Sequence, residues 1–130
     1  MENTKLYHKS IMWDSYFDYI CRKMINERNI VISDHAFNSF KERDIDKGYI
    51  FALLKYNRKG EIFEVEKNDR YINKFVIRMP YDLQKDVCIV LRDAYDSETQ
   101  TPYLIMPTVW LNNRNDKHFT LDASKYEKSL

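Results

Sequence analysis

The change in hydrophobic periodicity at Gly60 constrains the fold more than any other feature of the sequence. Before this residue, apolar side chains recur at helical spacing, first between Ser10 and Arg28 and later in KGYIFALLKY. After it, EIFEVE and RYINKFVIRM alternate apolar with polar residues, as half-buried strands do. KDVCIVLRDAY and YLIMPTVWL are nearly continuous apolar runs, which are typical of central strands. The pattern therefore predicts helices first and strands afterwards.

Capping residues divide the helical part into separate helices. Ser33 or Asp34 is suited to cap a second helix and Asp46 a third, because short polar side chains accept hydrogen bonds from the first free amides. We expect an α+β fold in which these N-terminal helices pack on one face of a C-terminal four-stranded antiparallel sheet. The predicted single domain has its helical part at about 10–58, its sheet at about 61–112 and a tail at 113–130.

Charge and apolar content narrow the class of protein. The formal net charge of +1 is far below what strong nucleic-acid binders usually carry. No apolar run is long enough for a membrane span or a signal peptide, so we expect a cytoplasmic protein without membrane contact. Cys21 and Cys88 lie in no metal-binding or CxxC pattern. We expect both to be buried free thiols, although the sequence alone also permits a disulfide between them.

Only a few side chains are suited to chemistry. The sequence has no phosphate-binding loop, zinc spacing or serine-nucleophile motif, and we expect neither a metal nor another cofactor. His35 lies near the start of the second predicted helix, and His118 follows the last predicted strand. Imidazole can act as acid or base near neutral pH, but each histidine is also compatible with a passive surface position. Likewise, Lys74 and Arg78 form either a solvated strand face or a phosphate-binding groove.

The run SDHAFNSFKERDIDKGYIFALL resembles the signature segment of small RelE-like and RegB-like endoribonucleases, toxin-like proteins of phages and bacteria. These belong to a broader superfamily with barnase, EndoU and colicin-type ribonucleases. His35, Arg43 and Ile45 match the family pattern, and the following helix leads into a strand in the same register. Ser39 stands where the family has an arginine, which removes one potential phosphate contact.

The resemblance implies metal-independent cleavage of single-stranded RNA. A base removes the proton of a ribose 2′-hydroxyl, the oxygen attacks phosphorus, and an acid protonates the leaving 5′-oxygen, which gives a 2′,3′-cyclic phosphate. The face with His35 and Arg43 would line the active surface of the sheet, while Phe37 and Phe40 pack inward. The implied catalytic residues are His35, His118 and Arg43, and the implied RNA-binding residues are Lys74, Arg78, Thr120 and Tyr126.

Two other interpretations stay open. In one, the RelE-like scaffold lacks catalysis and binds a protein partner such as an antitoxin, the ribosome or a host factor. In the other, it binds single-stranded nucleic acid through aromatic residues of the sheet without cutting it. The low net charge and Ser39 favour an interpretation without cleavage. RNA is the expected partner in the catalytic interpretation.

Overall fold

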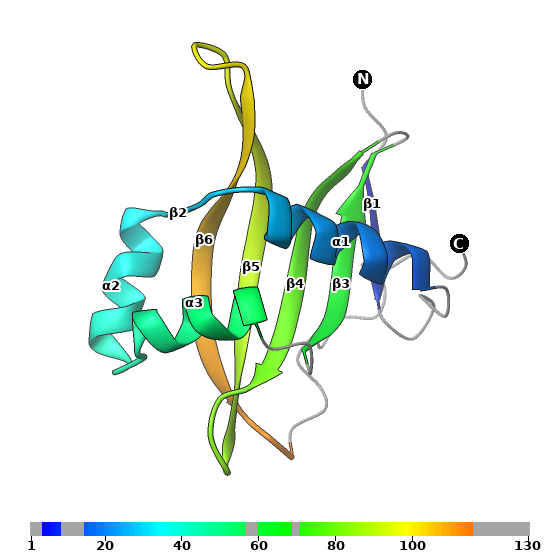
Figure 1. Ribbon diagram of the computed structural model, residues 1–130. Helices are drawn as coiled ribbons and strands as arrows, with labels where there is room; N and C mark the ends of the chain where they lie inside the picture. The colour runs from blue at the N-terminus through cyan, green and yellow to red at the C-terminus, as the bar shows by residue number, and fades with distance from the viewer. Residues whose placement is uncertain (1–3, 9–14, 57–59, 69–70, 116–130) are drawn as a thin grey trace.

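The computed structural model describes residues 4–8, 15–56, 60–68 and 71–115. Three helices lie across one face of a six-stranded β-sheet (Figure 1). The elements are, in chain order, β1 (Lys5–His8), α1 (Ser15–Glu27), β2 (Ile30–Ile32), α2 (Asp34–Glu42), α3 (Lys47–Tyr56), β3 (Glu61–Lys67), β4 (Ile72–Pro80), β5 (Lys85–Asp96) and β6 (Thr101–Asn113).

The sheet is mixed, with the strand order β1-β3-β4-β5-β6-β2. Consecutive strands from β3 to β6 pair antiparallel, β1 pairs antiparallel with β3, and β2 pairs parallel with β6. The prediction of helices followed by a four-stranded antiparallel sheet is therefore wrong, and the fold is a mixed α/β arrangement. The two additional strands have only four and three residues, too few to show an alternating pattern of their own.

The main hydrophobic core lies between the helices and the sheet. Alternate residues of β4 and β5 face the helices because successive strand residues point to opposite faces. On the helical side, the core contains Cys21 and Ile25 of α1, Phe40 of α2 and Leu53 of α3. The buried residues contributed by β4 and β5 are Phe75, Ile77, Met79, Val87, Ile89 and Leu91. The face of the sheet away from the helices is called the outer face below.

Helix α2 is attached to β6 at the edge of the sheet. Ser33 is the N-cap: its Oγ accepts a hydrogen bond from the Ala36 amide at 3.1 Å and donates one to the Pro107 carbonyl at 3.0 Å. The Ser33 amide also donates to the Met106 carbonyl. These three bonds fix the start of α2 beside β6, and they identify Ser33, one of the two predicted candidates, as the cap.

The exposed side of α2 differs from the prediction. Ala36, Ser39 and Phe40 are buried against the sheet, whereas Phe37 is 41% exposed and does not pack inward. Residues four apart share a helix face, so burial of Ala36 with Phe40 turns Phe37 toward solvent. The ammonium groups of Lys41 and Lys47 lie 4.7 and 5.5 Å from the centre of the Phe37 ring.

Gly60 is required for space rather than for backbone conformation. It is buried and its φ is not positive. A Cβ atom at this position would lie 2.6 Å from Met79 Cγ and 3.1 Å from Ile77 Cδ1. The residue at which the periodicity changes therefore lies against side chains of β4 that leave no room for a larger residue.

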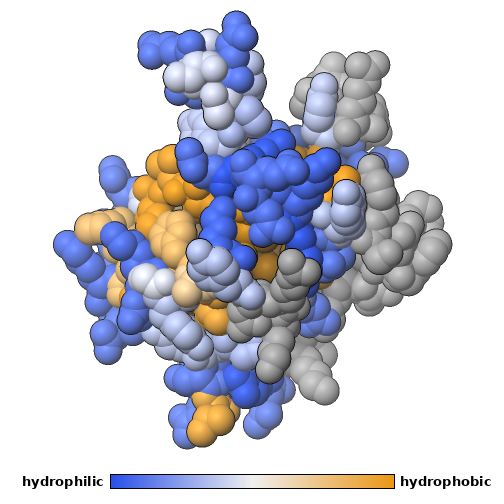
Figure 2. Space-filling model, viewed as in Figure 1, coloured by the Kyte–Doolittle hydropathy of each residue, from blue (hydrophilic) through white to orange (hydrophobic). Residues whose placement is uncertain are grey.

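The surface over α1 and the tip of the β5–β6 hairpin are mainly hydrophilic (Figure 2). In the part of the chain that the structure describes, no helix is both long and apolar enough to cross a bilayer. Cys21 and Cys88 are buried free thiols, which confirms the expectation from the sequence.

Phe40 and Phe37 form a matched pair for testing the packing of α2. Phe40→Ala should lower the free energy of unfolding by about 3–5 kcal/mol, because it leaves a cavity in the core. Phe37→Ala should cost less than about 1 kcal/mol, since it removes only a half-exposed ring and exposed cation–π contacts. Urea denaturation of both variants measures the difference. Equal losses would show that the assigned rotation of α2 is incorrect.

Candidate functional site

The residues that the sequence singled out lie on separate parts of the fold. His35 and Arg43 are exposed on α2, at the edge of the sheet. Lys74 and Arg78 alternate with the core residues of β4 and therefore project from the outer face. His118, Thr120 and Tyr126 lie outside the described residues. The described structure does not bring His35 and Arg43 together with Lys74 and Arg78.

Arg43 has a local structural contact. It is the C-cap of α2, and its Nη1 donates to the carbonyl of Val109 in β6 at 3.4 Å. Val109 lies in the part of β6 that follows the stretch paired with β2, and the Arg43 bond satisfies its backbone carbonyl. Ser33 at one end of α2 and Arg43 at the other thus join the helix to the same strand.

Ser39 points into the interface rather than toward a ligand. Its side chain is buried, and its Oγ donates to the His35 carbonyl one turn earlier, at 3.1 Å. An arginine with the same backbone would need room between α2 and the sheet. This position, where the resembling family has an arginine, therefore supports packing in this chain.

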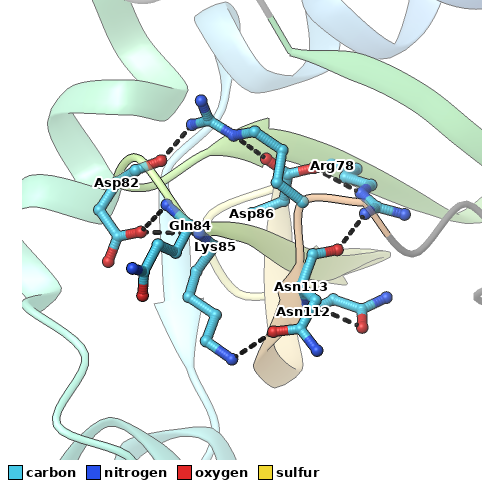
Figure 3. Close-up of polar contacts among 8 residues, drawn as sticks. Arg78, Asp82, Gln84, Lys85, Asp86, Asn112 and Asn113 are labelled. Carbon is cyan, nitrogen blue, oxygen red and sulfur yellow. Dashed lines mark hydrogen bonds and ion pairs between the residues drawn. The ribbon is translucent and has the colours of Figure 1, made fainter.

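Arg78 is held in a nearly buried ion pair. Its Nε donates to Asp86 Oδ2 at 2.8 Å, and its Nη2 donates to the Asn113 carbonyl at 3.0 Å (Figure 3). Only 8% of the Arg78 side chain and 14% of the Asp86 side chain are exposed. These contacts join β4, β5 and the end of β6, so the guanidinium is already occupied within the protein.

Further polar contacts extend this ion pair toward the β4–β5 turn. Asp86 Oδ1 accepts from Arg114 Nε at 3.4 Å, and Arg114 Nη2 donates to the Asp82 carbonyl. The Asp82 carboxylate accepts the amides of Gln84 and Lys85, both at 2.7 Å, and these bonds lower the pKa of Asp82. Figure 3 shows the group closing the turn beside the end of β6.

A pair of cations on the outer face has different surroundings. Lys74 on β4 lies directly opposite Arg92 on β5. Lys74 is half-buried and Arg92 is exposed. Glu66 lies on the other side of Lys74 in the register. Among the described residues, no ion pair or hydrogen bond joins the Lys74 or Arg92 side chain to an acid. Like charges directly opposite one another destabilise a sheet.

The acid next to Arg92 in the sequence does not neutralise it. Asp93 points to the other face of the sheet, because neighbouring strand residues alternate. There its carboxylate accepts from Arg28, just after α1. Asp93 therefore leaves the positive charge of Arg92 available at the outer face.

Apolar and aromatic side chains continue the row that contains these cations. The register pairs Arg92 with Ile105 of β6, and Ile105 with Val31 of β2. Tyr103 lies on the same face, two residues before Ile105, and pairs with Ala94. The outer-face strip, as this surface is called below, consists of Lys74, Arg92, Tyr103, Ile105 and Val31.

Arg92 was not selected from the sequence. It stands in the nearly continuous run KDVCIVLRDAY, where apolar residues on both faces hide the phase of the strand. Its outward position follows from the pairing with Lys74, which needs the register of β4 and β5. One feature of the sequence could have indicated Arg92: apart from the first residue, Lys85, it is the only basic residue in this run.

Comparison of the chain with protein-family models, curated proteins and solved structures finds no match.

Arg78 and Arg92 provide a test of which outer-face cation stabilises the fold. Arg78→Met should lower the free energy of unfolding by about 3 kcal/mol, because it leaves the Asp86 carboxylate nearly buried without its main partner. Arg92→Met should leave stability unchanged or raise it by up to about 1 kcal/mol, since it removes a like-charge repulsion. Thermal or urea unfolding measures both. A comparable loss in the two variants would contradict the different roles assigned to them.

Proposed function

We propose that this chain binds single-stranded RNA on the outer-face strip and does not cleave it. The observation that carries this proposal is the direct opposition of Lys74 and Arg92, neither of which forms an ion pair with an acid among the described residues, although Glu66 lies on the other side of Lys74. The pair weakens the sheet slightly on its own, and a bound phosphate would remove the repulsion. The low net charge of the chain does not oppose the proposal, because the attraction is local.

The other half of the strip favours a nucleic acid over a simple anion. Tyr103, Ile105 and Val31 extend the row from the cations toward the edge of the sheet, and half of the Val31 surface is exposed. Single-stranded nucleic acids combine charged phosphates with flat apolar bases, and their binding proteins combine basic side chains with aromatic ones. An acidic protein segment is the competing partner, and it would make less use of the apolar half.

The position of His35 is the reason for proposing binding without cleavage. His35 lies on α2, which packs against β6 at the edge of the sheet, whereas Lys74 lies two strands further in and on the outer face. A general base must come within hydrogen-bonding distance of the hydroxyl that it deprotonates. RNA phosphates held by Lys74 and Arg92 would be too far from His35 for that step. We propose the cytoplasm as the site of action, where free thiols such as Cys21 persist.

Removal of the two cations should weaken RNA binding through its electrostatic part. The double variant Lys74→Ala, Arg92→Ala should bind an oligonucleotide of about eight nucleotides at least 10-fold more weakly in low salt. Its plot of log affinity against log salt should be shallower by about 1–1.5, because two phosphate contacts are lost. Fluorescence anisotropy across a salt series measures both quantities.

The matched control is Lys41→Ala, Lys47→Ala, which removes the same charge from the exposed side of α2 and α3. This control should bind RNA nearly as the unchanged chain does. Equal weakening in the two double variants would indicate non-specific attraction and would contradict the strip. Tighter binding of an acidic peptide than of RNA would instead favour a protein partner.

Metal-independent cleavage is the second candidate function, and it rests on the resemblance of the segment around His35 and Arg43 to RelE-like ribonucleases. Under the proposal made here, RNA incubated with the chain in EDTA should stay intact for as long as it does with no protein. Electrophoresis and analysis of RNA ends provide the measurement. Products with 2′,3′-cyclic phosphates that disappear in His35→Ala and His118→Ala would establish cleavage, and they would overturn the non-catalytic proposal.

A further inference from the structure

A hollow of about 690 Å³ adjoins the outer-face strip. It lies between the edge strand β2 and the end of the β5–β6 hairpin, which projects beyond the rest of the sheet (Figure 1). Val31 and Tyr103 line the hollow and also belong to the strip, so the two surfaces are continuous. Asp96 and Glu98, at the end of β5 and in the turn that follows, also line the hollow.

The lining combines flat aromatic surface with hydrogen-bond acceptors. Tyr103 contributes its ring from the outer face, whereas Tyr95 pairs with Pro102 and projects from the opposite face of the hairpin. Asp96 and Glu98 add carboxylates in the turn. Asp96 Oδ1 already accepts the Glu98 amide at 3.0 Å, so Glu98 carries the carboxylate that is less committed to the turn.

Charge separates the two ends of the continuous surface. Lys74 and Arg92 attract a phosphate at one end, whereas Asp96 and Glu98 repel phosphate at the other. A nucleotide lying along the surface therefore has one favourable direction, with its phosphate on the cations and its base in the hollow. The hollow is within the size range of small-molecule pockets, which is sufficient for one base.

We propose that the hollow binds one nucleobase of the RNA, stacked on Tyr103, with its amino group facing the carboxylate of Glu98. This inference rests on the proposed RNA binding and adds a base-binding subsite to it. A carboxylate accepts a hydrogen bond from the exocyclic amino group of cytosine. Uracil has a carbonyl oxygen in the same place, which the carboxylate repels. The subsite therefore selects cytosine over uracil.

The experiment compares oligo(C) and oligo(U) of about eight nucleotides by fluorescence anisotropy at fixed salt. Oligo(C) should bind the unchanged chain about 10-fold more tightly than oligo(U). Tyr103→Ala should weaken both complexes by about 10-fold, because base stacking on an aromatic ring is lost. Glu98→Ala should reduce the preference for oligo(C) to less than about 2-fold while retaining most of the affinity for oligo(U).

The matched control is Tyr56→Ala, which removes an 85% exposed tyrosine at the end of α3, in the helical layer. This variant should bind both oligonucleotides as the unchanged chain does. Circular dichroism of Tyr103→Ala establishes that its sheet is intact. RNA binding that depends on Lys74 and Arg92 but not on Tyr103 would overturn the subsite and leave the proposed function standing. Absence of RNA binding by the unchanged chain would overturn both.

Discussion

The phase of the two central strands, β4 and β5, determines the rest of the structure. Phe75, Ile77 and Met79 of β4 face the helices, and the intervening Lys74 and Arg78 must then project from the outer face. The register with β5 places Arg92 opposite Lys74. A shift of one residue would move the cations of β4 into the core and its core side chains to the outer face, which strongly disfavours such a shift.

Sequence patterns identified the elements that are long enough to have a period. KGYIFALLKY forms α3 with the same residues, and the strands from β3 to β6 follow Gly60 in the predicted order. The sheet itself was predicted incorrectly because β1 and β2 are defined by pairing with distant strands rather than by local pattern. The rotation of α2 depended on contacts with β6, and these turned Phe37 outward. Single-domain organisation stays a prediction.

The candidate site was less predictable than the elements that carry it. Lys74 was selected from its place on an alternating strand, but Arg78 on the same face is occupied by Asp86, which stands eight residues later across a turn. Arg92 was hidden because its strand is apolar on both faces. Residue type alone therefore could not distinguish Arg78, which is held in an ion pair, from Arg92, which forms none among the described residues. Pairing partners and exposure make that distinction here, and they depend on the folded register.

The central claim is that Lys74 and Arg92 slightly lower the stability of the sheet and that the same two cations bind RNA. Arg92→Glu tests it most directly, because the new carboxylate would lie opposite Lys74 and form an attractive cross-strand pair. Measured on one preparation, the free energy of unfolding should rise by up to about 1 kcal/mol while the affinity for RNA falls at least 10-fold. Lower stability together with unchanged RNA affinity would contradict the account.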